Sequence, residues 1–180
     1  VKSEQATMLS FDTYNYLVHY FGQPQGSMAD DPNGTLGGDY EFVISDATAD
    51  RIELKGKKYG NRIVMKAFSA DQTWKQYLTR IKKVEDDAFF YEYDLRMDGL
   101  YTGQMLRSNY TFIVTYYDEV GKVHQKTVPF MFTTDGMRFH EPVTIDGQTM
   151  QNFVWKNEEI SFVCTDEGAT EVKLAGVYTA

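Results

Sequence analysis

The sequence predicts an α+β fold that is predominantly antiparallel β, arranged as meander-type sheets, a sandwich or a partial barrel. Three observations support this prediction. Apolar and polar residues alternate in many short segments, turn-forming residues separate those segments, and only one long stretch has a clear helical period. The 180 residues are also 42% hydrophobic and 15% aromatic, which allows a substantial core to form.

A short helix is expected over about residues 13–21, after the end of a strand at residues 9–11. Asp12 can serve as its N-cap, because an Asp side chain accepts hydrogen bonds from the free backbone amides at the start of a helix. The helical spacing would place four apolar residues in one stripe, namely Tyr14, Leu17, Val18 and Phe21. A strand is the alternative here, since Tyr and Val also favour β structure.

Residues 22–38 form the clearest loop, because Gly and Pro are dense there and interrupt both helix and strand. A well-specified helix is expected later, over about residues 70–85. Ser69 and Gln72 have the spacing of a capping box, in which each residue satisfies a backbone amide of the other. We expect this helix to pack on a sheet through an apolar stripe that consists of Trp74, Tyr77, Leu78, Ile81 and Val84.

The strands are expected before and after this helix, at about residues 40–45, 52–55, 62–67, 89–96, 110–117, 127–133, 139–145, 151–155, 160–165 and 171–174. We therefore predict a single β-rich domain over residues 1–180. The alternative is two related β units, about residues 1–68 and 88–180, joined by the helix at 70–85. A faint similarity between Met8–Asp12 and Met137–Glu141 favours this alternative.

The net charge of −8 argues against a general nucleic-acid-binding protein. The charge is unevenly spread, since ten basic and two acidic residues lie between Arg51 and Lys83. Such a segment could attract an anionic polymer or glycan. We favour the simpler interpretation that these basic side chains cover solvent faces and pair with acidic residues elsewhere.

Motifs that carry chemistry are missing from the sequence. It contains no GxxxxGK[ST], GxSxG or HExxH motif, and we expect no catalytic residues. The only cysteine, Cys164, is predicted to be a small buried hydrophobic residue. The longest apolar runs, such as Ala88–Tyr91, are too short for a membrane-spanning helix. Three histidines without metal-ligand spacing are interpreted as ordinary surface or core residues: His19, His124 and His140.

Two weaker hypotheses concern acidic residues. Calcium prefers several oxygen ligands, so a calcium site is conceivable in the loop, formed by Asp30, Asp31, Asn33 and Asp39. The spacing does not match an EF-hand, and we favour a solvated surface loop without any cofactor. The second hypothesis is a hydrolase whose carboxylates gather across the sheet, drawn from Asp12, Asp94 and Glu141.

The abundant tyrosines suit contact with carbohydrate, because flat rings stack against sugar faces. The rings considered for this role are Tyr14, Tyr16, Tyr20, Tyr91, Tyr93, Tyr101, Tyr116 and Tyr117. Tyr is also a strong strand former, and we expect most of these rings to pack in the fold. The sequence alone does not distinguish exposed rings from buried ones.

Three segments together resemble a known family: LSFDTYNYLVHYF at Leu9–Phe21, GGDYEFVI at Gly37–Ile44 and IELKGKKYGNRIVM at Ile52–Met65. The chain is similar to the uncharacterised lipoproteins of gut Bacteroidetes grouped as domain of unknown function 4302. The resemblance implies export, attachment by a lipidated N-terminal Cys that lies outside this sequence, and a link to outer-membrane nutrient uptake. It implies no catalytic residues. The sequence begins at Val1 rather than Met, so we expect it to be part of a longer protein.

The function we expect is a non-enzymatic binding or accessory module of an exported lipoprotein, at the cell surface or in the periplasm. Its partners would be a glycan or peptide ligand and outer-membrane uptake proteins, with no nucleic acid. The alternatives are a hydrolase with a carboxylate-based site and a structural scaffold without a ligand.

Overall fold

A computed structural model describes residues 6–22, 36–118 and 120–178. The chain divides into two compact units, Val1–Asp71 and Gln72–Ala180, which are described separately. Within the described residues, no helix is long and apolar enough to cross a membrane.

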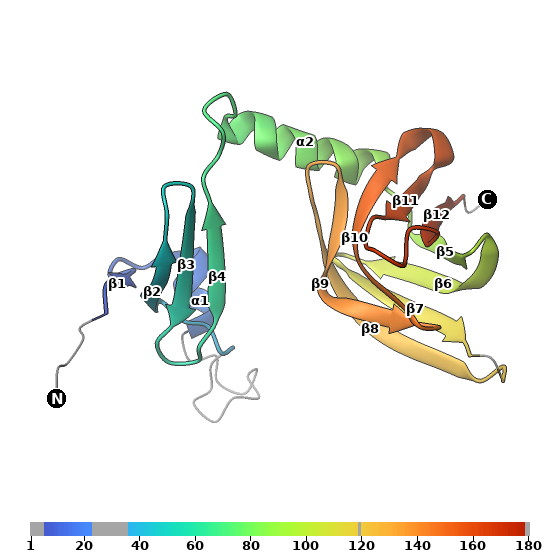
Figure 1. Cartoon of the computed structure of the whole chain (residues 1–180), viewed down its shortest axis with the longest axis horizontal. Coiled ribbons are helices and arrows are strands. Elements are labelled where there is room, and N and C mark those ends of the chain that lie inside the picture. The colour runs from blue at the N-terminus through green and yellow to red at the C-terminus, as the bar shows by residue number, and fades with distance from the viewer. Residues whose placement is uncertain (1–5, 23–35, 119, 179–180) are drawn as a thin grey trace. The chain divides into compact units, whose positions relative to one another are not determined.

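The first unit contains an antiparallel four-stranded sheet in the order β1-β2-β3-β4 (Figure 1). The strands are β1 (Met8–Ser10), β2 (Glu41–Ala47), β3 (Arg51–Gly56) and β4 (Arg62–Lys66), and the helix α1 spans Tyr16–Gly22. One face of the sheet carries the buried side chains of Phe42 and Leu54. The register aligns Ile44 with Leu54 and Leu54 with Ile63, so the apolar positions of three strands share this face.

Asp39 holds the turn between β3 and β4. Its buried carboxylate accepts hydrogen bonds from the backbone amides of Lys58, Tyr59 and Asn61 and from the Asn61 side chain. Gly56 lies against the same carboxylate, and a Cβ there would come within 1.9 Å of Asp39 Oδ2. A glycine is therefore required at this point of β3, because the carboxylate occupies the space of a side chain.

The second unit contains the helix α2 (Trp74–Asp87) and a closed barrel of eight strands (Figure 1). Each strand pairs antiparallel with the next along the chain, and the last strand pairs with the first to close the barrel. The strands are β5 (Glu92–Met97), β6 (Leu100–Ser108), β7 (Thr111–Tyr117), β8 (Val123–Phe132), β9 (Gly136–Ile145), β10 (Gln148–Lys156), β11 (Ser161–Cys164) and β12 (Lys173–Val177), with a short 3₁₀ helix at Asn157–Glu159.

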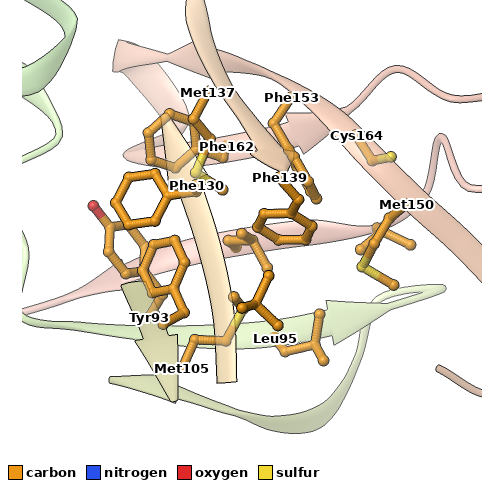
Figure 2. Close-up of a cluster of buried hydrophobic side chains, with 14 of the residues drawn as sticks. Tyr93, Leu95, Met105, Phe130, Met137, Phe139, Met150, Phe153, Phe162 and Cys164 are labelled. Carbon is orange, nitrogen blue, oxygen red and sulfur yellow. The ribbon is translucent and has the colours of Figure 1, made fainter. Parts of the chain in front are cut away.

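Side chains fill the interior of this barrel, because alternate residues of each strand point inward. Figure 2 shows the rings of Phe130, Phe139, Phe153 and Phe162 together with the sulfur-containing side chains of several methionines. Phe112 and Phe130 stack with their ring centroids 4.4 Å apart. The barrel is thus a packed core.

The last turn of α2 joins this core. Val84 and Ala88 are buried, and the hydroxyl of Tyr93 on β5 donates a hydrogen bond of 2.5 Å to the carbonyl oxygen of Ala88. At the other end of the helix, Trp74 is 68% exposed. Only the C-terminal part of α2 is therefore fixed to the barrel by apolar packing.

These observations confirm the predicted fold class, predominantly antiparallel β with two helices. Several details of the prediction were wrong. The first helix begins at Tyr16 rather than at residue 13. The capping box of α2 is formed by Thr73 and Gln76 rather than by Ser69 and Gln72, so the helix begins about one turn later. Its apolar stripe packs only in part, since Trp74 and Leu78 are exposed.

Strand β6 was not predicted. Its sequence LYTGQMLRS has an interior glycine and begins with exposed apolar residues, so the alternation is weak. The structure explains Gly103, because a Cβ there would meet the carbonyl oxygen of Thr115 on β7 at 2.3 Å. The two units also differ in topology, one an open sheet and the other a closed barrel. Their proposed relationship by duplication stays a prediction.

Candidate functional site

The strongest candidate site is a surface hollow of about 410 Å³ in the second unit, at the end of α2. We call it the Arg107 hollow and define it by its lining residues, which are Phe89, Phe90, Tyr91, Arg107, Ser108 and Asn109. Three of them follow α2 directly, and the other three lie at the end of β6 and in the turn to β7.

Backbone hydrogen bonds hold the two sides of the hollow together. The amide of Ala88 donates to the carbonyl oxygen of Val84 at the end of the helix. The amide of Phe90 donates to the carbonyl oxygen of Ala88. Across the hollow, the amide of Arg107 donates to the carbonyl oxygen of Tyr91 at 2.7 Å. The site is therefore built on paired main chain rather than on a free loop.

Arg107 points toward the end of the barrel core. It lies opposite Phe112 in the β6–β7 register, and Phe112 is an interior residue. Its guanidinium carbon lies 5.1–5.9 Å from the ring centroids of Phe89, Phe130 and Phe132, which are distances typical of cation–π contact. The side chain is only 11% exposed.

The polar contacts of Arg107 leave part of its hydrogen-bonding capacity unused. Nε donates to the carbonyl oxygen of Asn109 at 3.0 Å, whereas Nη2 lies 3.7 Å from Glu85 Oε1. The latter distance is too long for a hydrogen bond. In the described part of the chain, neither Nη atom donates a hydrogen bond. Neither atom is among the fully buried side-chain atoms that lack a partner, so both keep some exposure to solvent. The Nη groups therefore reach solvent beside the hollow.

Aromatic rings around the guanidinium remain exposed. Phe89 is 77% and Tyr91 67% exposed, although the barrel core begins only a few residues away. Tyr110 is also exposed, and its hydroxyl donates to Glu85 Oε1 at 3.1 Å. Exposed rings next to an arginine are a combination that binding surfaces favour.

The positive charge of Arg107 affects the buried Tyr93 hydroxyl in the barrel core. Burial raises the pKa of the Tyr93 hydroxyl to about 12, and the positive charge of Arg107 acts in the opposite direction. The Tyr93 hydroxyl is therefore neutral at physiological pH. The guanidinium is a local positive site next to an apolar core.

The predicted acidic sites have different outcomes. Asp30, Asp31 and Asn33 lie outside the described residues, so the calcium hypothesis stays a prediction. The carboxylate of Asp39 is occupied by the hydrogen bonds of the β3–β4 turn. Over residues 6–22, 36–118 and 120–178, there is no group of three or more His, Cys, Asp or Glu that could hold a metal ion.

Two of the carboxylates of the hydrolase hypothesis, Asp94 and Glu141, do not come together within the second unit. Asp12 belongs to the first unit, so its part in the hypothesis stays a prediction. Asp94 is on β5 and Glu141 on β9, four strands apart around a barrel of eight, so they lie on opposite sides. Asp94 instead pairs with Arg96 at 2.9 Å.

Two of the three histidines stack on tyrosine rings. His19 is buried and stacks between the rings of Tyr14 and Tyr40. His124 stacks on Tyr116 and lies 2.8 Å from Asp118 Oδ2, and His140 is exposed.

Cys164 is buried in the barrel, as predicted. Burial raises the pKa of its thiol to about 11, and the carboxylate of Asp166 at 3.4 Å adds to this increase.

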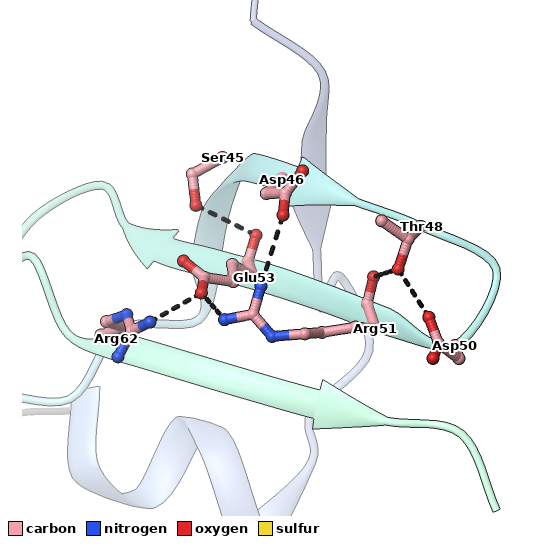
Figure 3. Close-up of polar contacts among 7 residues, drawn as sticks. All are labelled: Ser45, Asp46, Thr48, Asp50, Arg51, Glu53 and Arg62. Carbon is pink, nitrogen blue, oxygen red and sulfur yellow. Dashed lines mark hydrogen bonds and ion pairs between the residues drawn. The ribbon is translucent and has the colours of Figure 1, made fainter.

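Five of the ten basic side chains between Arg51 and Lys83 form ion pairs within the described chain, which agrees in part with the simpler interpretation; they are Arg51, Lys57, Arg62, Lys82 and Lys83. Arg51 lies between the carboxylates of Asp46 and Glu53, and Arg62 on β4 contacts Glu53 at 2.6 Å (Figure 3). On α2, two of the four basic side chains pair with acidic ones four residues later, in Lys82–Asp86 and Lys83–Asp87.

Sequence reasoning missed Arg107 and Phe89 as site residues. Of the tyrosines it considered, Tyr91 is in the hollow, whereas Tyr93 is buried in the core. The signal for Phe89 was its place directly after the helix, in the sequence AFFYEY. No signal marked Arg107, because the strand that carries it was not predicted.

The comparison with protein families gives one result. Residues 1–157 match the family model described as Domain of unknown function (DUF4302), which confirms the resemblance drawn from the sequence. Neither the curated proteins nor the solved structures gave a match.

Proposed function

This chain belongs to the DUF4302 family, and we propose that it is a non-enzymatic binding module whose ligand enters the Arg107 hollow. The observation that carries this proposal is the exposure of Phe89 and Tyr91 beside a nearly buried guanidinium. Large rings that remain in water forgo a stabilisation of roughly 1.5–3 kcal/mol each, which a bound ligand would supply.

A glycan is the ligand class that we propose for this hollow. Exposed ring faces stack on the C–H faces of sugars, while Arg107, Ser108 and Asn109 offer polar groups to hydroxyls. An extended peptide would most easily add to a free strand edge. At the hollow, β6 offers no such edge, because Arg107 is opposite Phe112 of β7 on one side and its amide donates to the carbonyl oxygen of Tyr91 on the other.

We propose further that the module works outside the cytoplasm, as part of an exported lipoprotein linked to nutrient uptake. The support for this is the sequence resemblance described above. The test is to express the full-length native protein in its own host and measure its accessibility to protease added to intact cells. Full protection in intact cells and recovery in the cytoplasmic fraction would contradict this part of the proposal.

Binding is tested by screening the purified chain on a glycan array and measuring the affinity of each hit by isothermal titration calorimetry. We expect Phe89→Ala and Tyr91→Ala each to weaken binding about tenfold, which corresponds to about 1.4 kcal/mol. The matched control is Tyr101→Ala, because Tyr101 is an exposed ring of the same barrel outside the hollow. The control should bind like the unchanged protein.

Two outcomes would contradict the proposal. One is an array without any reproducible hit. The other is a ligand whose affinity is unchanged in both Phe89→Ala and Tyr91→Ala.

A further inference from the structure

We infer that Arg107 binds a carboxylate of the ligand, so that the hollow takes an acidic saccharide in preference to a neutral one. This inference rests on the proposed function and adds the chemical class of the sugar.

The guanidinium has donors without acceptors. Only Nε of Arg107 makes a hydrogen bond within the described chain, to Asn109. The N–H groups on the two Nη atoms form the planar fork that matches the two oxygens of a carboxylate. Because the side chain is only 11% exposed, water solvates this fork on one side at most. A carboxylate in the hollow would satisfy donors that the protein leaves open.

The charges near Arg107 leave its positive charge incompletely neutralised. Glu85 is the acidic side chain that faces it, with Oε1 at 3.7 Å from Nη2. That carboxylate is shared, since it accepts a hydrogen bond from Tyr110 and lies 3.8 Å from Lys82 Nζ. The rings of Phe89, Phe130 and Phe132 also lie against the guanidinium, and they carry no charge.

The rings and the guanidinium together fit a sugar that bears an acid group. A uronic acid has a flat C–H face and a carboxylate at the edge of the same ring. Stacking on the exposed ring of Tyr91 would bring that edge toward Arg107, because the two residues are neighbours across the hollow, joined by the hydrogen bond of 2.7 Å between the Arg107 amide and the Tyr91 carbonyl oxygen. The guanidinium and a ring can therefore contact one sugar residue at the same time.

The experiment compares trigalacturonic acid with its methyl ester by calorimetry, because the ester keeps the sugar and removes the charge. We expect the unchanged protein to bind the acid at least about tenfold more tightly than the ester. Raising the NaCl concentration from about 0.05 to 0.5 M should weaken binding of the acid and leave binding of the ester unchanged. Arg107→Gln should bind the acid and the ester equally, while the control Arg138→Gln, an exposed arginine of β9, should keep the preference.

The outcomes separate this inference from the proposed function. Equal binding of acid and ester by the unchanged protein would overturn the role of Arg107 and leave a neutral-sugar site. Preference for the peptide Ala-Ala-Tyr over its C-terminal amide, without binding of either saccharide, would overturn the sugar class. If neither saccharide nor the peptide binds while the array has a neutral-glycan hit, the inference about an acidic sugar is wrong and the proposed function stands. An array without any hit would overturn both. If Arg107→Gln fails to fold, the comparison of acid with ester and its salt dependence still decide the question in the unchanged protein.

Discussion

Replacing Asp39 by Asn should destabilise the first unit of the chain. Its two carboxylate oxygens accept from four donors, at 2.7 and 3.0 Å for the amides of Lys58 and Tyr59 and at 3.2 and 2.9 Å for the amide and side chain of Asn61. An Asn side chain has one acceptor oxygen and presents an NH₂ group to the other pair of donors. Hydrogen bonds to a charged group contribute about 1.5–3 kcal/mol each, and partial access of water reduces the loss. We expect a cost of about 2–4 kcal/mol in the free energy of unfolding of this unit.

The assay is native-state hydrogen exchange by NMR, which reports the two units separately. The amides of β2 and β3 should lose protection by about 30- to 1,000-fold in Asp39→Asn, whereas those of β7 and β8 in the barrel should be unchanged. Asp12→Asn is the control, because Asp12 is an exposed acidic residue of the same unit. The reasoning is refuted if the two variants have the same protection in β2 and β3.

Because Asp39 is ionisable, we expect the stability of the first unit to depend on pH. Burial raises the pKa of Asp39, but the hydrogen bonds from Tyr59, Lys58 and Asn61 together outweigh burial and lower it. A lowered pKa contributes stability that is present above the unfolded-state value of about 3.9 and is lost as the pH falls through the folded-state value. Protection of β2 and β3 should therefore decrease below about pH 4, and Asp39→Asn should make this decrease smaller.

Two further predictions concern the barrel. Tyr93→Phe removes the buried hydrogen bond to the carbonyl oxygen of Ala88 and should lower the free energy of unfolding by about 1–2 kcal/mol. The measurement is the midpoint of urea unfolding followed by fluorescence, which should decrease. An unchanged midpoint would contradict the prediction. Cys164, whose thiol is buried with a pKa of about 11, should react with iodoacetamide at pH 8 far more slowly in the native protein than in urea, as followed by mass spectrometry. Equal rates would show that the thiol is accessible.

The local structure of the chain could be predicted where side-chain periodicity is strong. Segments such as Thr111–Tyr117 alternate clearly between inward and outward residues, and the structure places them in strands. The position of α2 was less certain, because Ser69–Gln72 and Thr73–Gln76 have equal spacing and only the second pair forms the capping box. Local chemistry allows both, and in the structure the chain is extended at Thr73, with φ −98° and ψ 156°, so the helix begins after this residue.

The sequence by itself determined the class of fold, the burial of Cys164 and the family, since these depend on local patterns and composition. Only the tertiary structure decided that β12 pairs with β5, more than seventy residues away, and that Arg107 meets Phe89 and Glu85. The physical reason is that barrel closure follows from strand order and register, which many alternating sequences share. The position of a site residue then depends on which strands become neighbours, and no short sequence pattern contains that information.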